Sequence, residues 1–119
     1  MLTVEEKTQA VVAALEDIKA NDITVLNTNK FNSLFERMVI ASAQSTRQTK
    51  ALADNVAEQL KLRGETVLGV EGEDPGEWIL VDLGEVVVHI MQPAVRAYYN
   101  LEELWSMQHL PRNAARGAR

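Results

Sequence analysis

Two apolar runs separated by a short turn constrain the fold more than any other part of this chain. The first run covers residues 78–83 and the second covers residues 86–91, with Gly84-Glu85 between them. Both runs are rich in Val, Ile and Leu and have the length of ordinary strands, and a two-residue link containing Gly is typical of an antiparallel hairpin. The sequence therefore predicts a hairpin over residues 78–91.

Amphipathic helices are predicted on either side of this hairpin. Thr3 and Glu6 form a capping box, in which each side chain accepts from the other residue's backbone N–H, and apolar residues then recur at helical spacing. Ser45 and Gln48 predict a second capping box, and Gly64 follows that helix at the position where Gly usually ends one. The predicted helices are residues 4–20, 45–63 and 93–100, with a last turn at 101–105.

Three further strands are predicted, at residues 22–28, 35–43 and 66–70. Residues 38–41 are continuously apolar, which suits a strand covered on both faces. A strand, a helix and a strand in succession predict a right-handed crossover unit. We expect a single α/β domain, residues 1–106, with a mixed sheet of about five strands flanked by helices, followed by a flexible basic tail over residues 107–119.

Composition limits the kind of protein. The chain has 119 residues, of which 46% are hydrophobic, so one domain can bury a core. It has no cysteine, no apolar stretch of membrane-spanning length, and no signal-peptide pattern at its start, and these features favour a cytoplasmic protein without a membrane role.

The charge is uneven along the chain. The net charge is −5, but residues 1–105 hold nine of the twelve basic residues and all seventeen acids, a balance of −8. Such a body repels nucleic acid and attracts a basic partner, although an acidic surface also simply keeps a protein dispersed. The tail carries Arg112, Arg116 and Arg119 and no acid, so whether it contacts RNA directly or is only solvated is left open.

Catalytic and metal-binding patterns are weak. No thiol is present, His89 lies in an apolar run, and no Ser-His-Asp spacing points to it, so a structural or surface histidine is the better interpretation. The acids between residues 71 and 77 lack the ordered spacing of a calcium loop. We therefore expect no enzyme activity, no metal site and no cofactor.

Aromatic residues favour protein recognition instead. Trp78, Tyr98, Tyr99 and Trp105 lie within one third of the chain and are the residue types that dominate interfaces, although Trp78 and Trp105 would also suit a core. Strand edges of the hairpin would be available to a partner or to a second copy of the chain, so a homodimer is an alternative. Acids would surround this surface and attract a basic partner: Glu71, Glu73, Asp74, Glu77, Glu102 and Glu103.

One ordered set of short motifs carries a family resemblance. Gly69-Val-Glu-Gly72 is followed by Trp78, Asp82-Leu-Gly84, Val88-His89, Arg96, Tyr99 and Leu101-Glu-Glu-Leu-Trp105. In this order the motifs resemble the ribosomal silencing factor family, also called the Iojap-related family, over residues 3–106. The resemblance implies a nucleotidyltransferase-like fold and binding to the large ribosomal subunit through its protein fourteen. A bound factor would block joining of the small subunit and lower translation when nutrients are short.

The resemblance also implies a set of partner-binding residues, which are Trp78, Asp82, His89, Met91, Arg96, Tyr99, Leu101 and Trp105. A nucleotide-binding domain or nucleotidyltransferase-like enzyme is the alternative. Enzymes of that fold need an acid-x-acid pair on a strand, whereas Asp82 and Glu85 are three residues apart and no Gly-rich loop precedes the helix at 45–63.

Overall fold

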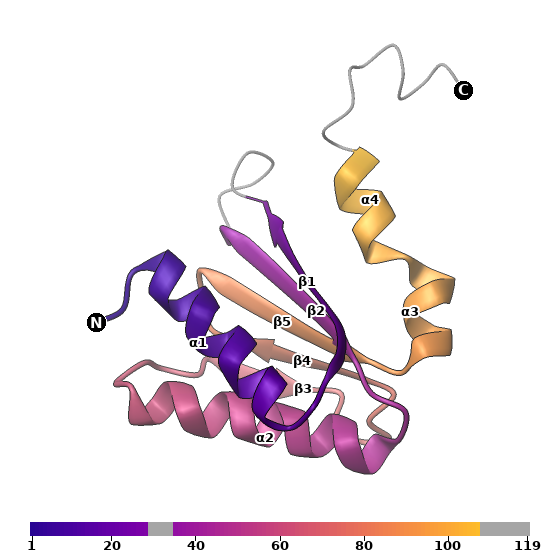
Figure 1. The fold of residues 1–119 in the computed structure, drawn as a ribbon, viewed down its shortest axis with the longest axis horizontal. Helices are drawn as coiled ribbons and strands as arrows, with labels where there is room; N and C mark the ends of the chain where they lie inside the picture. The colour runs from indigo at the N-terminus through magenta and orange to yellow at the C-terminus, as the bar shows by residue number, and fades with distance from the viewer. Residues whose placement is uncertain (29–34, 108–119) are drawn as a thin grey trace.

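The computed structural model describes the backbone of residues 1–28 and 35–107 and the side chains of residues 1–28 and 35–104. Five strands form one sheet in the spatial order β1-β2-β5-β4-β3 (Figure 1). β2 and β5 are parallel and the other neighbouring pairs are antiparallel, so the predicted mixed sheet is confirmed. The strands are β1 (Asn21–Asn27), β2 (Arg37–Ser42), β3 (Gly69–Glu71), β4 (Trp78–Asp82) and β5 (Val86–Met91).

The predicted hairpin is formed by β4 and β5. Gly84 turns the chain with a φ of +89°, and its N–H donates to Asp82 Oδ1 at 2.9 Å. The expectation that this hairpin exposes a strand edge is wrong, because β5 pairs with β2 and β4 pairs with β3. Within the described residues the sheet edges are β1 and β3, so an edge-to-edge contact through the hairpin is ruled out.

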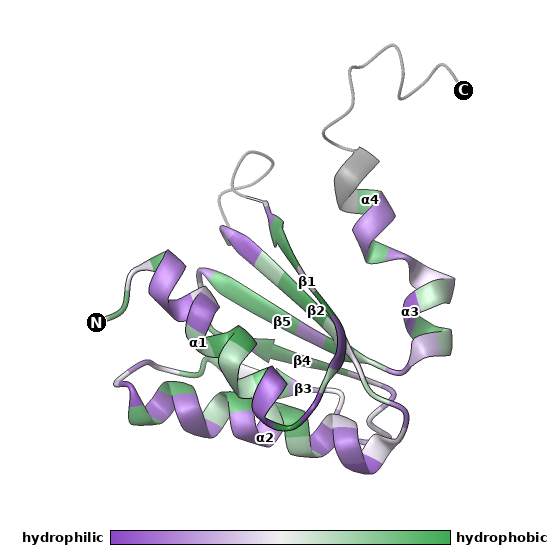
Figure 2. Ribbon diagram, viewed as in Figure 1, coloured by the Kyte–Doolittle hydropathy of each residue, from purple (hydrophilic) through white to green (hydrophobic). Residues whose placement is uncertain are grey.

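Two helices cover one face of the sheet. α1 (Val4–Asp17) and α2 (Thr46–Leu62) lie side by side against it (Figure 1). Their apolar side chains pack on alternate residues of the strands, and Figure 2 shows both helices changing from apolar to polar around their axes. The sheet contributes Val39, Ala41, Ile79, Val81, Val86, Val88 and Ile90 to this main core.

The capping predictions are half confirmed. Thr3 and Glu6 form the expected capping box at α1. Ser45 accepts from the Gln48 N–H, but the Gln48 side chain donates instead to the carbonyls of Ile18 and Lys19, at 3.2 and 3.3 Å. Carbonyls at a helix end lack intrahelical partners, so Gln48 satisfies the end of α1. α1 ends at Asp17 rather than at residue 20, and the chain turns at Lys19 with a φ of 62°.

A buried lysine joins α1 to two connections. Lys7 Nζ lies 3.2 Å from Glu65 Oε1 and 3.3 Å from Glu85 Oε1, and the side chains of Lys7 and Glu65 are 8% and 6% exposed. The Leu2 N–H donates to Glu65, and together with Lys7 it holds the pKa of that carboxylate below its usual range. The cluster fixes α1 against the α2–β3 connection and the hairpin turn.

The opposite face of the sheet, called the open face below, holds a second and smaller apolar cluster. Met38, Ile40, Val87 and Met91 are buried there, so residues 38–41 are covered on both faces as predicted. α3 (Pro93–Tyr99) and α4 (Leu101–Met107) follow β5 and lie away from α1 and α2 (Figure 1). They contribute Val95 and Leu101 to this cluster.

The predicted last turn at 101–105 is a separate helix, α4. Asn100 has φ 50° and ψ 57°, which breaks the regular helix between α3 and α4. The strand predicted at 66–70 begins later, as β3. The predicted tail, apart from Met107, lies outside the described residues. In the described ranges, no helix is both long and apolar enough to cross a membrane.

Candidate partner-binding face

Rows of side chains cross the open face from strand to strand. Strand pairing places Ile40 beside His89, His89 beside Leu80, and Leu80 beside Glu71. It also places Ser42 beside Met91 and Met91 beside Trp78. Side chains two residues apart on a strand point to the same face, so these rows form one surface. Figure 2 shows the apolar character of β2 and β5 that lies beneath it.

Trp78 and His89 form a polar pair on this surface. Trp78 Nε1 donates to His89 Nδ1 at 2.9 Å, with the ring centroids 5.8 Å apart. Burial of His89 lowers its pKa from 6.5 to about 4, because the imidazolium would lose its hydration. The ring is therefore neutral at pH 7. Since Nδ1 accepts a hydrogen bond, the proton lies on Nε2.

Two tyrosines extend this pair outward from α3. The Tyr99 ring lies 4.9 Å from Trp78, and the Tyr98 ring lies 5.0 Å from Tyr99 at 84°, edge to face. Tyr98 is 82% exposed and Tyr99 is 54% exposed. Trp78, Tyr98 and Tyr99 are called the aromatic ledge below. They combine a partly buried base with exposed rings, as an interface anchor requires.

A shallow hollow lies beside the ledge. It has a volume of about 240 Å³ and is lined by Glu71, Gly72, Trp78, Leu80 and His89. Of the six acids that the sequence placed around the aromatic surface, Glu71 lines the hollow, and Glu73, Asp74 and Glu77 are exposed in the turn between β3 and β4. The hollow is smaller than most small-molecule sites and better suited to one protruding side chain of a partner.

Arg96 faces inward rather than toward solvent. Its side chain is only 11% exposed. Its guanidinium donates to Ser42 on β2, to Thr24 on β1 and to Glu102 on α4. Sequence reasoning selected Arg96 and missed Ser42 and Thr24, because nothing local in the sequence pairs these positions.

The other predicted site residues lie at different depths. Met91 is fully buried between its strand neighbours Ser42 and Trp78, and Leu101 is partly buried against the second cluster. Asp82 lies two residues beyond Leu80 on β4, next to the hairpin turn, where its carboxylate accepts from Gly84. The side chain of Trp105 lies outside the described residues. The structure thus brings together Trp78, His89, Met91 and Tyr99, and it places Asp82 apart from them.

The two acids considered for metal-dependent nucleotide chemistry, Asp82 and Glu85, each bind another group of the protein. The described part of the chain contains no group of three or more His, Asp or Glu side chains that could hold a metal ion. Asp82 accepts from Gly84, and Glu85 accepts from Lys7. A pair of cations needs converging carboxylates, and these two diverge.

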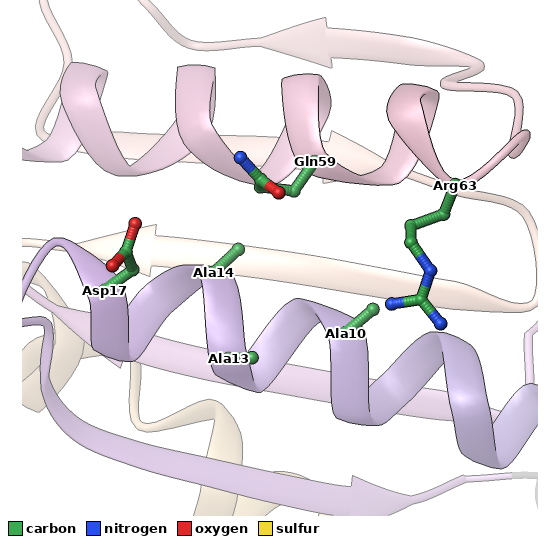
Figure 3. A pocket seen from close by; sticks show the side chains of 6 residues that line it. All are labelled: Ala10, Ala13, Ala14, Asp17, Gln59 and Arg63. Carbon is green, nitrogen blue, oxygen red and sulfur yellow. The ribbon is translucent and has the colours of Figure 1, made fainter.

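A second hollow lies between α1 and α2. It measures about 330 Å³, and Figure 3 shows the exposed side chains of Asp17 and Arg63 toward its opposite ends. It is also lined by Ala10, Ala13 and Ala14 of α1, with Gln59 between the two charges. Small residues let the two helices approach closely, which explains the groove as a packing feature of the α1–α2 contact.

The fold is that of a small single-domain α/β protein, with a half-covered sheet face, an aromatic ledge and an exposed acidic turn. The family model described as "Ribosomal silencing factor during starvation" matches residues 2–118. The chain belongs to the ribosomal silencing factor family, as the sequence motifs indicated.

Relatives support this assignment. A ribosomal silencing factor from Chromobacterium violaceum is 50% identical over 107 residues, covering 90% of this chain and 88% of the relative. One from Haemophilus influenzae is 38% identical over 96 residues, covering 81% of this chain and 94% of the relative. A crystal structure of a C. violaceum protein matches with a TM-score of 0.87 at 50% identity, covering 88% of each chain.

Proposed function

We propose that this protein is a translation repressor of the cytoplasm, which binds the large ribosomal subunit through its protein fourteen and blocks joining of the small subunit. The activity needs no catalysis and no cofactor, since a protein bound on the surface where the two subunits meet is sufficient to prevent their joining. The observation that carries the proposal is the aromatic ledge, which combines a half-buried Trp78 with exposed tyrosines. Family membership supplies the class of partner.

The proposed binding face is centred on Trp78, His89 and Tyr99. Met91 lies beside Trp78 on the neighbouring strand, and Leu101 extends the face to α4. Trp105 stays a predicted contact, because its side chain lies outside the described residues. Aromatic side chains bury a large area at little entropic cost, so a few of them can provide most of the binding free energy. The acids of the turn between β3 and β4 would favour encounter with a basic ribosomal protein.

Sedimentation of purified ribosomal subunits with the protein tests this proposal. We expect the protein to migrate with the large subunit and the peak of joined ribosomes to decrease. Protein that stays at the top of the gradient, with an unchanged joined peak, would exclude the proposal.

Substitution of Tyr99 by Ala locates the binding face. Because Tyr99 is 54% exposed, its loss should leave the fold intact by circular dichroism and weaken subunit binding by about 1–4 kcal/mol. The control is Leu62→Ala, which removes a 73% exposed side chain from α2 on the other side of the sheet and should leave binding unchanged. Equal binding by both variants would place the contact elsewhere.

A further inference from the structure

We propose that Arg96 is a positioning residue, whose guanidinium fixes α4 against the sheet and so presents the partner-binding face in one arrangement. The inference builds on the proposed function, because it assigns Arg96 a role within the same face. Arg96 itself then does not contact the partner. It acts through the orientation of α4.

The contacts of Arg96 join three elements at one buried point. Nη1 donates to Ser42 Oγ at 2.8 Å, and Nη2 donates to Thr24 Oγ1 at 3.0 Å. Nε and Nη2 donate to Glu102 Oε2 at 3.2 and 2.6 Å. A planar guanidinium with five N–H groups can serve all these acceptors at once, whereas a lysine ammonium cannot reproduce the fork. The group therefore ties β1 and β2 to α4.

α4 has little else to hold it within the described residues. It is seven residues long, too short to be stable as an isolated helix, and it is separated from α3 by the left-handed backbone of Asn100. Of its described side chains, Leu101 packs against the second apolar cluster, whereas Glu103 and Leu104 are exposed. Among the described side chains, Leu101 and the pair between Arg96 and Glu102 are therefore the chief contacts that orient α4.

Adjacent glutamates on α4 provide a matched test. Glu102 contacts the inward-facing Arg96, whereas Glu103 Oε1 accepts from the exposed Asn100 side chain. Glu102→Gln and Glu103→Gln remove the same charge from neighbouring positions. Any loss of electrostatic attraction is thus equal in the two variants, and only Glu102→Gln alters the contact with Arg96.

Two measurements are made on the full chain. The first is amide hydrogen exchange of α4 in the free protein, and the second is affinity for purified large subunits at fixed salt. For Glu102→Gln we expect exchange in α4 to become about tenfold faster and affinity to fall about tenfold, as for loss of a charge-assisted contact. For Glu103→Gln we expect both to stay within about twofold. Exchange in β2 and β5 should be unchanged in both.

Arg96→Lys is a second variant that keeps the charge and loses the fork, and it should resemble Glu102→Gln in both measurements. Equal losses of affinity in Glu102→Gln and Glu103→Gln would overturn the inference, because charge alone would then explain them. Faster exchange in α4 with full affinity would also overturn it. If the wild-type protein does not bind the subunit, the proposed function fails, whereas the exchange comparison still decides whether Arg96 fixes α4.

Discussion

Gly72 occupies a backbone position that a side chain would disrupt. Its φ is +89°, and a Cβ built there would lie 2.1 Å from the carbonyl oxygen of Trp78. The positive φ alone costs a residue with a side chain roughly 1–2 kcal/mol, and the close contact adds to it. Gly72→Ala should therefore destabilise the protein by about 2 kcal/mol or more and displace Trp78.

Gly69 is the matched control for Gly72. It lies at the start of β3, three residues before Gly72, and a Cβ there would meet nothing within 4 Å. Gly69→Ala should change stability by less than about 1 kcal/mol. Urea unfolding followed by tryptophan fluorescence compares the two variants, and equal stabilities would show that the acidic turn tolerates a side chain.

His89 gives the protein a defined pH dependence. Its pKa is lowered from 6.5 to about 4, so the unfolded chain binds the proton more readily than the folded one. The stabilisation of the fold that comes from keeping His89 neutral is fully present above pH 6.5, decreases as the pH falls, and is lost below about pH 4. The total is up to about 3 kcal/mol.

His89→Gln removes this titration and isolates its contribution. The difference in unfolding free energy between wild type and variant should fall by up to about 3 kcal/mol between pH 6.5 and 4. NMR of the imidazole nitrogens should also show the proton on Nε2 at pH 7. A difference in unfolding free energy that stays constant across this pH range would contradict the assigned environment of His89. A titration midpoint of its imidazole near 6.5 would contradict it as well.

Among the elements, α1 is fixed by a lysine that has almost no contact with solvent. Lys7 lies between Glu65 and Glu85 and also donates to the carbonyl of Leu83. Removing one member of a buried charged cluster leaves its partners without compensation. Lys7→Met should therefore destabilise the protein by about 2–4 kcal/mol, as measured by urea unfolding at pH 7.

Arg37 provides the comparison for Lys7, since it also pairs with a glutamate. Its partner Glu5 is 68% exposed and the contact is 3.3 Å long. Solvent screens such a pair, so Arg37→Met should cost less than about 1 kcal/mol. A larger loss in Arg37→Met than in Lys7→Met would refute the importance assigned to the buried cluster.

The sequence predicted the elements well where a local rule decides them. The hairpin, the α1 capping box and the doubly covered residues 38–41 follow from turn chemistry, side-chain reach and apolar periodicity. The role of Gln48 was not predictable, because its acceptors Ile18 and Lys19 lie 30 and 29 residues away. The three elements joined by Arg96 were hidden for the same reason.

At the scale of the whole molecule, strand order is what the sequence did not reveal. Hairpin strands are adjacent in the chain, but β5 also pairs with β2, which precedes it by a helix and two strands. This long-range pairing buries the hairpin edge that the sequence suggested for a partner. The aromatic residues were found from their composition, whereas their grouping into a ledge depends on how β4, β5 and α3 pack.

The charge of the whole body leads to the last prediction. Residues 1–105 carry −8, and the acids of the turn between β3 and β4 are exposed, so association with a basic partner should be accelerated at long range. The Debye length falls from about 10 Å at 0.1 M salt to about 3 Å at 1 M, which screens this attraction. The association rate with the large subunit should therefore decrease severalfold with salt, and dissociation should change much less.

Stopped-flow mixing of labelled protein with purified large subunits measures both rates. Glu73→Gln combined with Glu77→Gln removes two exposed charges from the acidic turn and should reduce both the association rate and its salt dependence. Asp54→Asn with Glu58→Gln is the matched control, because these acids are exposed on α2 across the sheet. If both pairs slow association equally, net charge steers the encounter. If only the first pair slows association, the acids of the turn between β3 and β4 steer it. A rate independent of salt would remove electrostatic attraction from the binding mechanism.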